Sequence, residues 1–382
     1  MDRLHIAIFG PTNSGKSTLV NAIAGQPVSL VSPVPGTTTD PVRKPIEIPG
    51  LGPCVLIDTA GLDDTGVLGA ERLRLTRAVL DETDVAILLP MAADFEKLAT
   101  QAGIPVVRYK RGESIESLIR RIRDVRPAEE EASFLTGHLV EAGDTVLLVM
   151  PQDSEAPKGR LILPQVQVIR ELLDRGCHPL CCTPDSLTTA LASLKALPAL
   201  TITDASVFQT VNAALPPEAP LTAFSILLAA AKGDINVYVA GARAIDRLTP
   251  QSRVLIAEAC THVPDTEDIG RVKIPALLQS YISERHKASE MPDQARHDER
   301  PDQARHDGGL QIEIAAGNDF PEDLSPYDLI VHCGACVASR QLVRSRIRKA
   351  LLAGVPITNY GIALAKLQGI LDRVVIPQPR TR

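Results

Sequence analysis

The chain has 382 residues, a formal net charge of −6 at pH 7, 45% hydrophobic residues, 3% aromatic residues and no tryptophan. This length corresponds to two or three domains, and the hydrophobic fraction is sufficient for packed cores, which excludes an intrinsically disordered chain. The acidic balance argues against broad nucleic-acid binding, and the scarcity of aromatic rings argues against a stacking surface for single strands. We therefore expect no nucleic-acid partner.

The N-terminal residues and the apolar segments favour a cytoplasmic protein. Met1–Ile6 runs directly into a strand-like segment without a signal-peptide pattern. The longest apolar stretch, near Ile226–Ala231, is far shorter than the roughly 20 residues that cross a bilayer. No membrane partner is expected, and in a reducing compartment the seven cysteines suggest metal or redox chemistry rather than disulfides.

Residues 1–126 alternate short apolar runs with helical patterns. The predicted strands are Leu4–Phe9, Val55–Ile57, Val85–Leu89 and Val106–Tyr109, and the predicted helices are Lys16–Ala24, Gly69–Leu80, Phe95–Ala102 and Ser114–Arg123. Strands that alternate with helices predict a parallel sheet covered by helices on both faces. The polar, proline-containing segment Arg126–Glu131 is a candidate linker.

The same alternation continues through residues 134–234 and 235–382, so the predicted fold class is α/β, with one parallel sheet followed by two further α/β domains. The predicted strands are Thr145–Met150, Pro179–Cys182, Ala199–Thr203, Arg253–Glu258 and Leu329–His332, and the predicted helices are Gln165–Asp174, Ser186–Leu194, Thr222–Ala231, Pro275–Arg285 and Arg340–Ala353.

A direct repeat interrupts the last domain. The sequence PDQARHD occurs at residues 292–298 and again at 301–307. Two copies are too few for a solenoid, and the segment has almost no large apolar residues, so we predict a disordered surface insertion near residues 287–309. His297 and His306 lie in it and are expected to be solvated.

A phosphate-binding signature follows the first predicted strand. Residues 10–17 read GPTNSGKS and fit the pattern G-x-x-x-x-G-K-[ST] between a strand and a helix. Backbone N–H groups of such a loop surround phosphate oxygens, Lys16 supplies charge to the β and γ phosphates, and the Ser17 hydroxyl binds Mg²⁺. The predicted nucleotide-binding residues of this loop are Gly10, Asn13, Ser14, Gly15, Lys16, Ser17 and Thr18. The first domain is therefore expected to be a P-loop GTPase-like parallel sheet.

Two further segments strengthen the nucleotide prediction. Asp58-Thr59-Ala60-Gly61 ends a predicted strand and has the form D-x-x-G, in which Asp58 holds Mg²⁺ through water and the Gly61 N–H senses a γ-phosphate. Residues 36–40, GTTTD, lie between the two motifs and fit a switch segment whose threonines can reach the metal.

These motifs resemble the TrmE/Era-like GTPase family, which includes tRNA-modification and ribosome-assembly GTPases. The resemblance implies GTP and Mg²⁺ as cofactors, with Ser17, Thr38 and Asp58 around the metal, and K⁺ held by Asn13 as in potassium-activated members. The family reads guanine with N-K-x-D after the fifth strand, whereas residues 106–112 read VVRYKRG. We therefore expect phosphate and Mg²⁺ binding with weak selectivity for GTP over ATP.

Cysteine and histidine residues follow two predicted strands of the last domain. Cys260 and His262 form C-x-H after one strand, and His332, Cys333 and Cys336 form H-C-x-x-C after another. Parallel strand ends can present both groups at one sheet edge, which predicts a metal site. Zinc would take three cysteines and a histidine, whereas an iron–sulfur cluster would take the three thiolates and leave one iron exchangeable.

Three other cysteines are expected to be structural. Cys177, Cys181 and Cys182 lie in or beside a short apolar strand, where adjacent side chains point to opposite faces.

The full set of motifs resembles the [FeFe]-hydrogenase maturation GTPase family, HydF. The P-loop domain, the segment QDSEAPKGRLILPQ at residues 152–165, KGD at residues 232–234 and the cysteine motif carry this resemblance. It implies a homodimer formed by the middle domain and a [4Fe–4S] cluster on Cys260, Cys333 and Cys336, with His262 and His332 as further candidates. It also implies a scaffold that receives a diiron precursor from radical-SAM maturases and delivers it to apo-[FeFe]-hydrogenase.

Two other functions remain open at this stage. One is a ribosome-assembly or tRNA-modification type GTPase with a zinc-binding tail, against which the acidic charge balance counts. The other is a non-hydrolysing nucleotide-binding scaffold whose chemistry is confined to the metal site.

Overall fold

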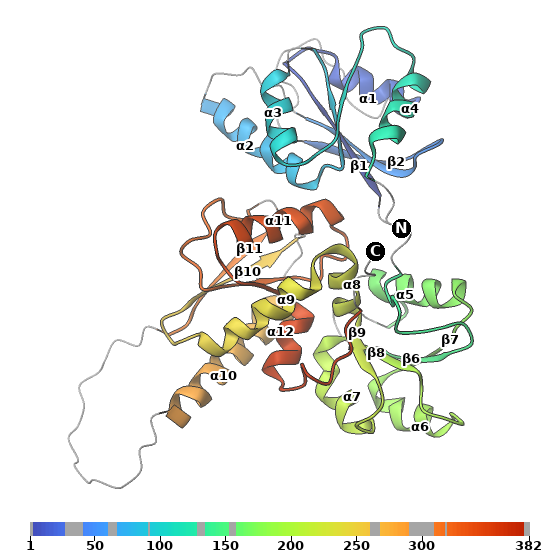
Figure 1. The fold of residues 1–382 in the computed structure, drawn as a ribbon, viewed down its shortest axis with the longest axis vertical. Helices are drawn as coiled ribbons and strands as arrows, with labels where there is room; N and C mark the ends of the chain where they lie inside the picture. Colours follow the sequence, from blue (N-terminus) through green and yellow to red (C-terminus); the bar gives the residue numbers. More distant parts are fainter. Residues whose placement is uncertain are drawn as a thin grey trace, which may run out of the picture. The chain divides into compact units, whose positions relative to one another are not determined.

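The computed structural model describes residues 3–26, 41–59, 67–90, 92–127, 134–152, 158–259, 268–289, 309–317 and 319–377. Residues 1–132 and 338–346 form one compact unit, and residues 133–337 and 347–382 form the other. Three sheets make up the described part of the chain, one in the first unit and two in the second, each with helices beside it (Figure 1). The α/β class expected from the alternation of strands and helices is confirmed.

The first unit is built on a five-stranded sheet in the order β2-β3-β1-β4-β5. Its elements are β1 Leu4–Phe9, α1 Lys16–Ala24, β2 Val42–Ile48, β3 Gly52–Asp58, α2 Val67–Glu82, β4 Val85–Leu88, α3 Ala93–Gln101, β5 Val106–Arg108 and α4 Ile115–Val125.

This sheet is mixed, which corrects the expectation of an all-parallel sheet. β2 pairs with β3 in the antiparallel sense, and the other pairs are parallel. β2 was not predicted, because its segment, VRKPIEI, is interrupted by Pro45 and only half-buried. A proline is tolerated there because β2 is an edge strand, which has one side without a ladder partner.

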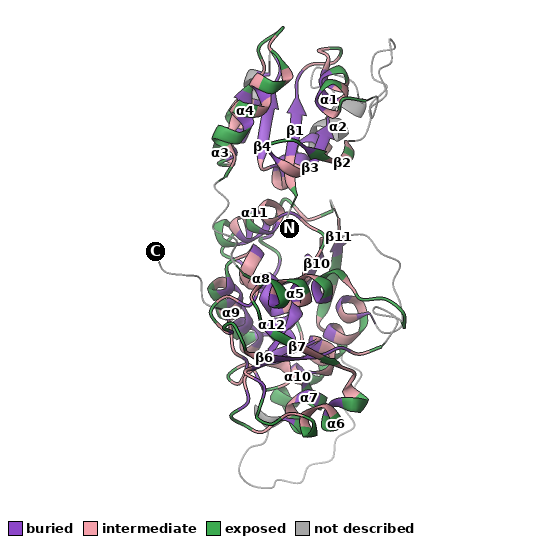
Figure 2. Cartoon of the chain, turned by 90° about the vertical axis from the view of Figure 1, so that its right-hand side faces the viewer, coloured by how far each residue is buried: buried purple, intermediate pink, exposed green. Residues whose placement is uncertain are grey.

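Helices cover both faces of this sheet. Leu19 and Val20 of α1 and Leu118 of α4 pack on one face. Val79 of α2 and Phe95 of α3 pack on the other. The central strands are buried on both sides, as Figure 2 shows for β1 and β4, and for that reason their sequences are continuous apolar runs.

The second sheet has four parallel strands in the order β7-β6-β8-β9. Its elements are β6 Thr145–Val149, α5 Leu163–Asp174, β7 His178–Cys182, α6 Leu187–Ala192, β8 Leu200–Thr203, α7 Phe208–Ala214, β9 Leu221–Ala223 and α8 Phe224–Lys232. A single helix was expected over 222–231, but its first residues belong to β9, because an unbroken apolar run does not show where a strand ends and a helix begins.

The third sheet has four parallel strands in the order β11-β10-β12-β13, the same arrangement as the second. Its elements are α9 Ile235–Ala242, β10 Arg253–Glu258, α10 Ile274–Ser289, β11 Gln311–Ala316, β12 Leu329–His332, α11 Arg340–Leu352, β13 Ile357–Asn359 and α12 Tyr360–Leu367.

Close backbone contact fixes α9 against this sheet. A Cβ at Gly241 would lie 2.0 Å from the Ile357 carbonyl oxygen, so only glycine allows the helix to approach β13 this closely.

The described residues do not include the whole of the predicted insertion. Residues 290–308, which contain both copies of the repeat, lie outside them, as do residues 128–131 of the candidate linker. Among the helices that the structure describes, none has the length and apolar character needed to cross a membrane.

Candidate functional site

The predicted phosphate loop connects β1 to α1 in a tight curl. Asn13 and Gly15 adopt left-handed backbone conformations, with φ of 59° and 95°. A Cβ at Gly10 would lie 2.8 Å from Ser14 Oγ, so a glycine is required where the loop closes on itself. Successive N–H groups in such a curl form an anion-binding concavity at the start of the helix.

Lys16 lies within this curl. Its side chain is buried, and its ammonium group donates to the carbonyl oxygens of Gly10 at 3.0 Å and Pro11 at 2.7 Å. The positive charge is therefore held beside the loop that would cradle the β and γ phosphates. Thr18 is exposed on the first turn of α1.

Ser17 in the first turn of α1 and Asp58 at the end of β3 come together. The Ser17 hydroxyl donates to Asp58 Oδ2 at 2.7 Å. Asp58 is buried at the end of β3, which pairs with β1 in a register that sets Asp58 opposite Ile8. A hydroxyl and a carboxylate oxygen at this spacing suit Mg²⁺, which prefers oxygen ligands. Thr38 and Gly61, the other predicted residues of this site, lie outside the described residues.

The loop after β5 is the segment in which the sequence lacks the expected N-K-x-D. Its carboxylate is Glu113, which accepts from Arg121 Nη1 at 2.8 Å and from the Lys110 backbone N–H at 3.1 Å. Glu113 is therefore held by its own loop and by Arg121 of α4.

We expect weak discrimination between GTP and ATP, because a buried pair of base-edge hydrogen bonds is what supplies several kcal/mol of selectivity. Competition between the two Mg²⁺-triphosphates for the purified protein is the measurement. A preference for GTP above about a thousandfold, roughly 4 kcal/mol, would contradict this expectation. In that case, a Glu113→Gln variant tests whether Glu113 moves away from Arg121 and itself binds the base.

The C-x-x-C segment follows β12 and is fixed by its backbone. The Cys333 N–H donates to the Ala257 carbonyl oxygen at 2.9 Å, which continues the ladder between β10 and β12. Cys333 Sγ accepts from the backbone N–H groups of Ala259 at 3.1 Å and Ala335 at 3.4 Å. Hydrogen bonds of this kind to a cysteine sulfur tune iron–sulfur clusters.

His332 is fully buried at the end of β12. Its Nδ1 lies 2.8 Å from the carbonyl oxygen of Cys333, which also accepts from Asn359 Nδ2 at 3.4 Å. These contacts orient the imidazole and the Cys333 peptide together.

Lys232, the last residue of α8, supports the same segment from another part of the chain. Its side chain is only 4% exposed, and its ammonium group donates to the carbonyl oxygens of Ala335 at 3.0 Å and Cys336 at 3.2 Å. A buried ammonium requires such partners, so a positive charge is fixed beside the two cysteines. Sequence reasoning marked Lys232 only as the end of a domain.

Tyr360 also lies near this segment. A Cβ at Gly270 would lie 2.0 Å from the Tyr360 hydroxyl and 3.1 Å from Glu258 Oε1, so the hydroxyl and the carboxylate both pack against that glycine. Burial, followed by the Cys333 sulfur and Glu258, raises the pKa of Tyr360 well above its ordinary value. Tyr360 therefore remains neutral, and its buried hydroxyl has no hydrogen-bond partner among the described residues.

The structure describes only some of the predicted metal-binding residues. Cys333 and Cys336 are both partly exposed, whereas Cys260 and His262 lie outside the described residues. Within the residues that are described, no three His, Cys, Asp or Glu side chains gather as a metal site. The Ala259 contact nevertheless brings the residue before Cys260 to the Cys333 sulfur.

Replacing Lys232 with methionine is expected to lower the free energy of unfolding by roughly 2 kcal/mol or more, because two buried carbonyls lose their donor. We also expect less iron to be retained and a lower midpoint potential for a cluster held there. Lys195→Met removes an exposed lysine and is the control. Equal iron content and equal midpoint potential in Lys232→Met and the wild type would contradict a role of Lys232 in supporting the cluster.

The fold and both sites define a P-loop GTPase domain followed by two parallel α/β domains. A family model described as 50S ribosome-binding GTPase matches residues 5–123. The model of the hydrogen maturase F dimerization domain matches residues 135–233, and that of the tetramerization domain matches residues 236–304 and 301–377. The two maturase models together cover more than half of the sequence, and the chain belongs to the hydrogen maturase F family.

Curated relatives are similar to this chain over only part of their own length. The chain is 41% identical over 92 residues to the human mitochondrial 5-taurinomethyluridine-tRNA synthase subunit GTPB3, which is 24% of this chain and 18% of that protein. It is 34% identical over 144 residues to the tRNA modification GTPase MnmE of Xanthomonas oryzae, 37% of this chain and 32% of that protein. It is 41% identical over 108 residues to MnmE of Acidiphilium cryptum, 28% of this chain and 24% of that protein. The chain thus spans less than a third of these relatives.

The two matched pieces of the tetramerization model overlap at residues 301–304. This overlap falls inside the PDQARHD duplication. The interruption of the family pattern therefore coincides with the predicted insertion.

Proposed function

We propose that this protein is a scaffold for [FeFe]-hydrogenase maturation. It binds GTP with Mg²⁺, carries a [4Fe–4S] cluster on Cys260, Cys333 and Cys336, and delivers a diiron precursor to apo-hydrogenase. The observation that carries the proposal is the hydrogen bond from the Ala259 N–H to Cys333 Sγ. It joins the segment that leads into Cys260 to the C-x-x-C motif.

The donor set of this site suits an iron–sulfur cluster. Three thiolates hold three corners of a [4Fe–4S] cube, and N–H groups directed at a sulfur stabilise its negative charge. When bound, the cluster supplies an iron whose remaining coordination position can exchange ligands. His262 and His332 are the candidates for that position, and Lys232 balances the charge of the thiolates from the side of α8.

The nucleotide site supplies the regulatory half of the proposal. Lys16 would bind the β and γ phosphates, while Ser17, Thr38 and Asp58 would surround Mg²⁺. Gly61 would sense the γ-phosphate, and K⁺ would be held with the help of Asn13. Binding and loss of GTP would then change the contacts of the scaffold with its partners, the radical-SAM maturases and apo-hydrogenase.

Self-association is supported by the dimerization and tetramerization domains. The surface of α5 fits a homodimer contact in the middle domain. Leu163, Val166 and Leu173 are each about half-exposed and lie on one side of the helix at spacings of three and seven residues. An exposed apolar row of this kind is typical of an interaction surface.

Anaerobic purification with iron, sulfide and zinc analysis tests the proposal. A brown protein with about four iron and four sulfide per chain, and an EPR signal after reduction, supports it. A colourless protein that contains zinc would instead support the GTPase with a zinc-binding tail. A metal-free protein that still binds triphosphate would leave only a nucleotide-binding scaffold.

A further inference from the structure

The second sheet has a pocket at the carboxyl ends of its strands. The chain passes from β6 to β7 on one side and then to β8 on the other. Ligands of open α/β sheets bind at such a change of direction. The phosphate loop follows β1 and the C-x-x-C segment follows β12, so the other two sheets place their candidate sites at strand ends as well. A pocket of about 570 Å³ opens at the end of β6, a volume that suits a small organic ligand.

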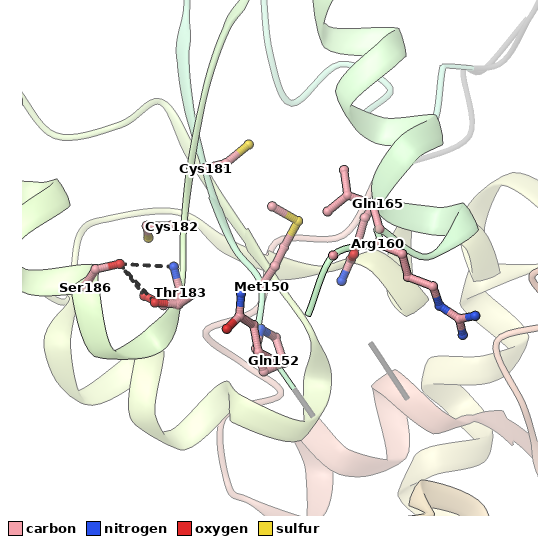
Figure 3. A pocket seen from close by; sticks show the side chains of 11 residues that line it. Met150, Gln152, Arg160, Gln165, Cys181, Cys182, Thr183 and Ser186 are labelled. Atoms are coloured by element: carbon pink, nitrogen blue, oxygen red, sulfur yellow. Dashed lines mark hydrogen bonds between the residues drawn. The ribbon is translucent and has the colours of Figure 1, made fainter. Parts of the chain in front are cut away.

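Three segments of the middle domain line this pocket (Figure 3). They are the residues after β6, the residues that lead into α5 with its first turn, and the end of β7 with the turn that follows it. The lining residues are Met150, Pro151, Gln152, Gly159, Arg160, Leu161, Gln165, Cys181, Cys182, Thr183 and Ser186.

Hydrogen bonds hold the wall of the pocket in place. Gln165 is 1% exposed, its Oε1 accepts from the Ile162 N–H at 3.1 Å, and its Nε2 donates to Asp204 Oδ2 at 3.0 Å. Because Asp204 follows β8, the hydrogen bond from Gln165 connects α5 to the segment after β8, across the carboxyl end of β6. The hydroxyls of Thr183 and Ser186 lie 3.1 Å apart on the opposite wall. The cavity is therefore formed before a ligand arrives.

Among the described lining residues, the charge at the mouth is positive. Arg160 is the one charged side chain among the lining residues, is exposed, and makes no ion pair with another side chain that the structure describes. Its guanidinium lies at the edge of the pocket, away from the thiols (Figure 3). A guanidinium presents paired N–H donors that match a carboxylate.

The two cysteines do not form a metal site. Cys181 and Cys182 are adjacent in β7, and their sulfur atoms point in different directions (Figure 3). Burial raises the pKa of both thiols above their ordinary value, so both are protonated at neutral pH. Together with Met150 and Leu161 they provide an apolar, polarisable wall.

We propose that this pocket binds a small organic carboxylate, with Arg160 on the carboxylate and Met150 and Leu161 against the carbon skeleton. Such a site lies apart from both the nucleotide and the cysteine motifs in the sequence and is independent of the function proposed above. It would give the middle domain a ligand of its own.

Titration calorimetry of the full chain with succinate and citrate tests this site. Saturating Mg²⁺-GTP keeps the phosphate loop occupied. We expect saturable binding at about millimolar concentration or below, weakened at least about tenfold in Arg160→Gln and partly retained in Arg160→Lys. Arg170→Gln, which alters an exposed arginine of α5 paired with Asp174, is expected to bind like the wild type. Succinamide, the neutral analogue of succinate, is expected not to bind.

Three results would overturn the proposal. The first is no saturable binding of either acid up to about 10 mM, which corresponds to less than about 3 kcal/mol. The second is equal binding by Arg160→Gln and the wild type. The third is binding of inorganic phosphate as tight as that of the acids with the same dependence on Arg160, which would make the site a general anion site.

Discussion

Replacing Lys16 with alanine is expected to weaken the binding of Mg²⁺-GTP by at least about a hundredfold. Among the described residues, Lys16 is the one lysine whose ammonium group donates to carbonyl oxygens of the phosphate loop. Hydrogen bonds between charged groups contribute about 1.5–3 kcal/mol each, and two such bonds to phosphate oxygens correspond to a hundredfold or more in affinity. Fluorescence titration with a labelled GTP analogue measures the change.

Two variants separate a loss of phosphate contacts from a loss of fold. Lys16→Met keeps most of the buried side-chain volume but removes the charge and the donor to the Gly10 and Pro11 carbonyls. It should therefore bind as poorly as Lys16→Ala and lose roughly 2 kcal/mol of unfolding free energy while remaining folded. Lys97→Ala removes an exposed lysine of α3 and should bind GTP normally. Unchanged affinity in both Lys16 variants would show that residues 10–17 do not bind the triphosphate.

The interior strands could be read from the sequence because burial on both faces leaves little freedom in composition. β1, β10 and β12 were predicted to the residue, and each contains at least three consecutive buried apolar side chains next to a polar residue or glycine. β9 and β13 were missed because each has three residues and passes directly into a helix. Nothing local marks the point where such a run leaves the sheet.

The two sites differ in how much of them the sequence reveals. The phosphate loop lies within eight consecutive residues, so its pattern is visible without a fold. The support of the C-x-x-C segment comes from Lys232, Ala259 and Asn359, and two of these three contacts are more than 70 residues apart in the chain. One of them uses only a backbone N–H, which any residue could supply, so no residue type signals it.

Single replacement of Cys260, Cys333 or Cys336 by serine is expected to remove most of the iron from the reconstituted protein. Each thiolate holds one corner of the cube, and a hydroxyl is a poor substitute for a soft ligand. At Cys333 the two N–H groups that face the sulfur would also lose their acceptor. Anaerobic reconstitution followed by iron and sulfide analysis and EPR measures the loss. Cys181→Ser and Cys182→Ser in β7 are the matched controls and should retain the wild-type iron content.

The histidine variants are expected to behave differently from the cysteine variants. His262→Ala and His332→Ala should keep the cluster and change its EPR signature and its ability to activate hydrogenase, because a ligand on the exchangeable iron must leave when a diiron unit docks. His332 is fully buried and contacts the Cys333 carbonyl, so its loss should also lower the free energy of unfolding by about 1–3 kcal/mol. His332→Asn keeps a side-chain donor and separates the two effects. Loss of iron from either alanine variant equal to that in Cys333→Ser would make that histidine a permanent ligand and remove the exchangeable position from the proposed mechanism.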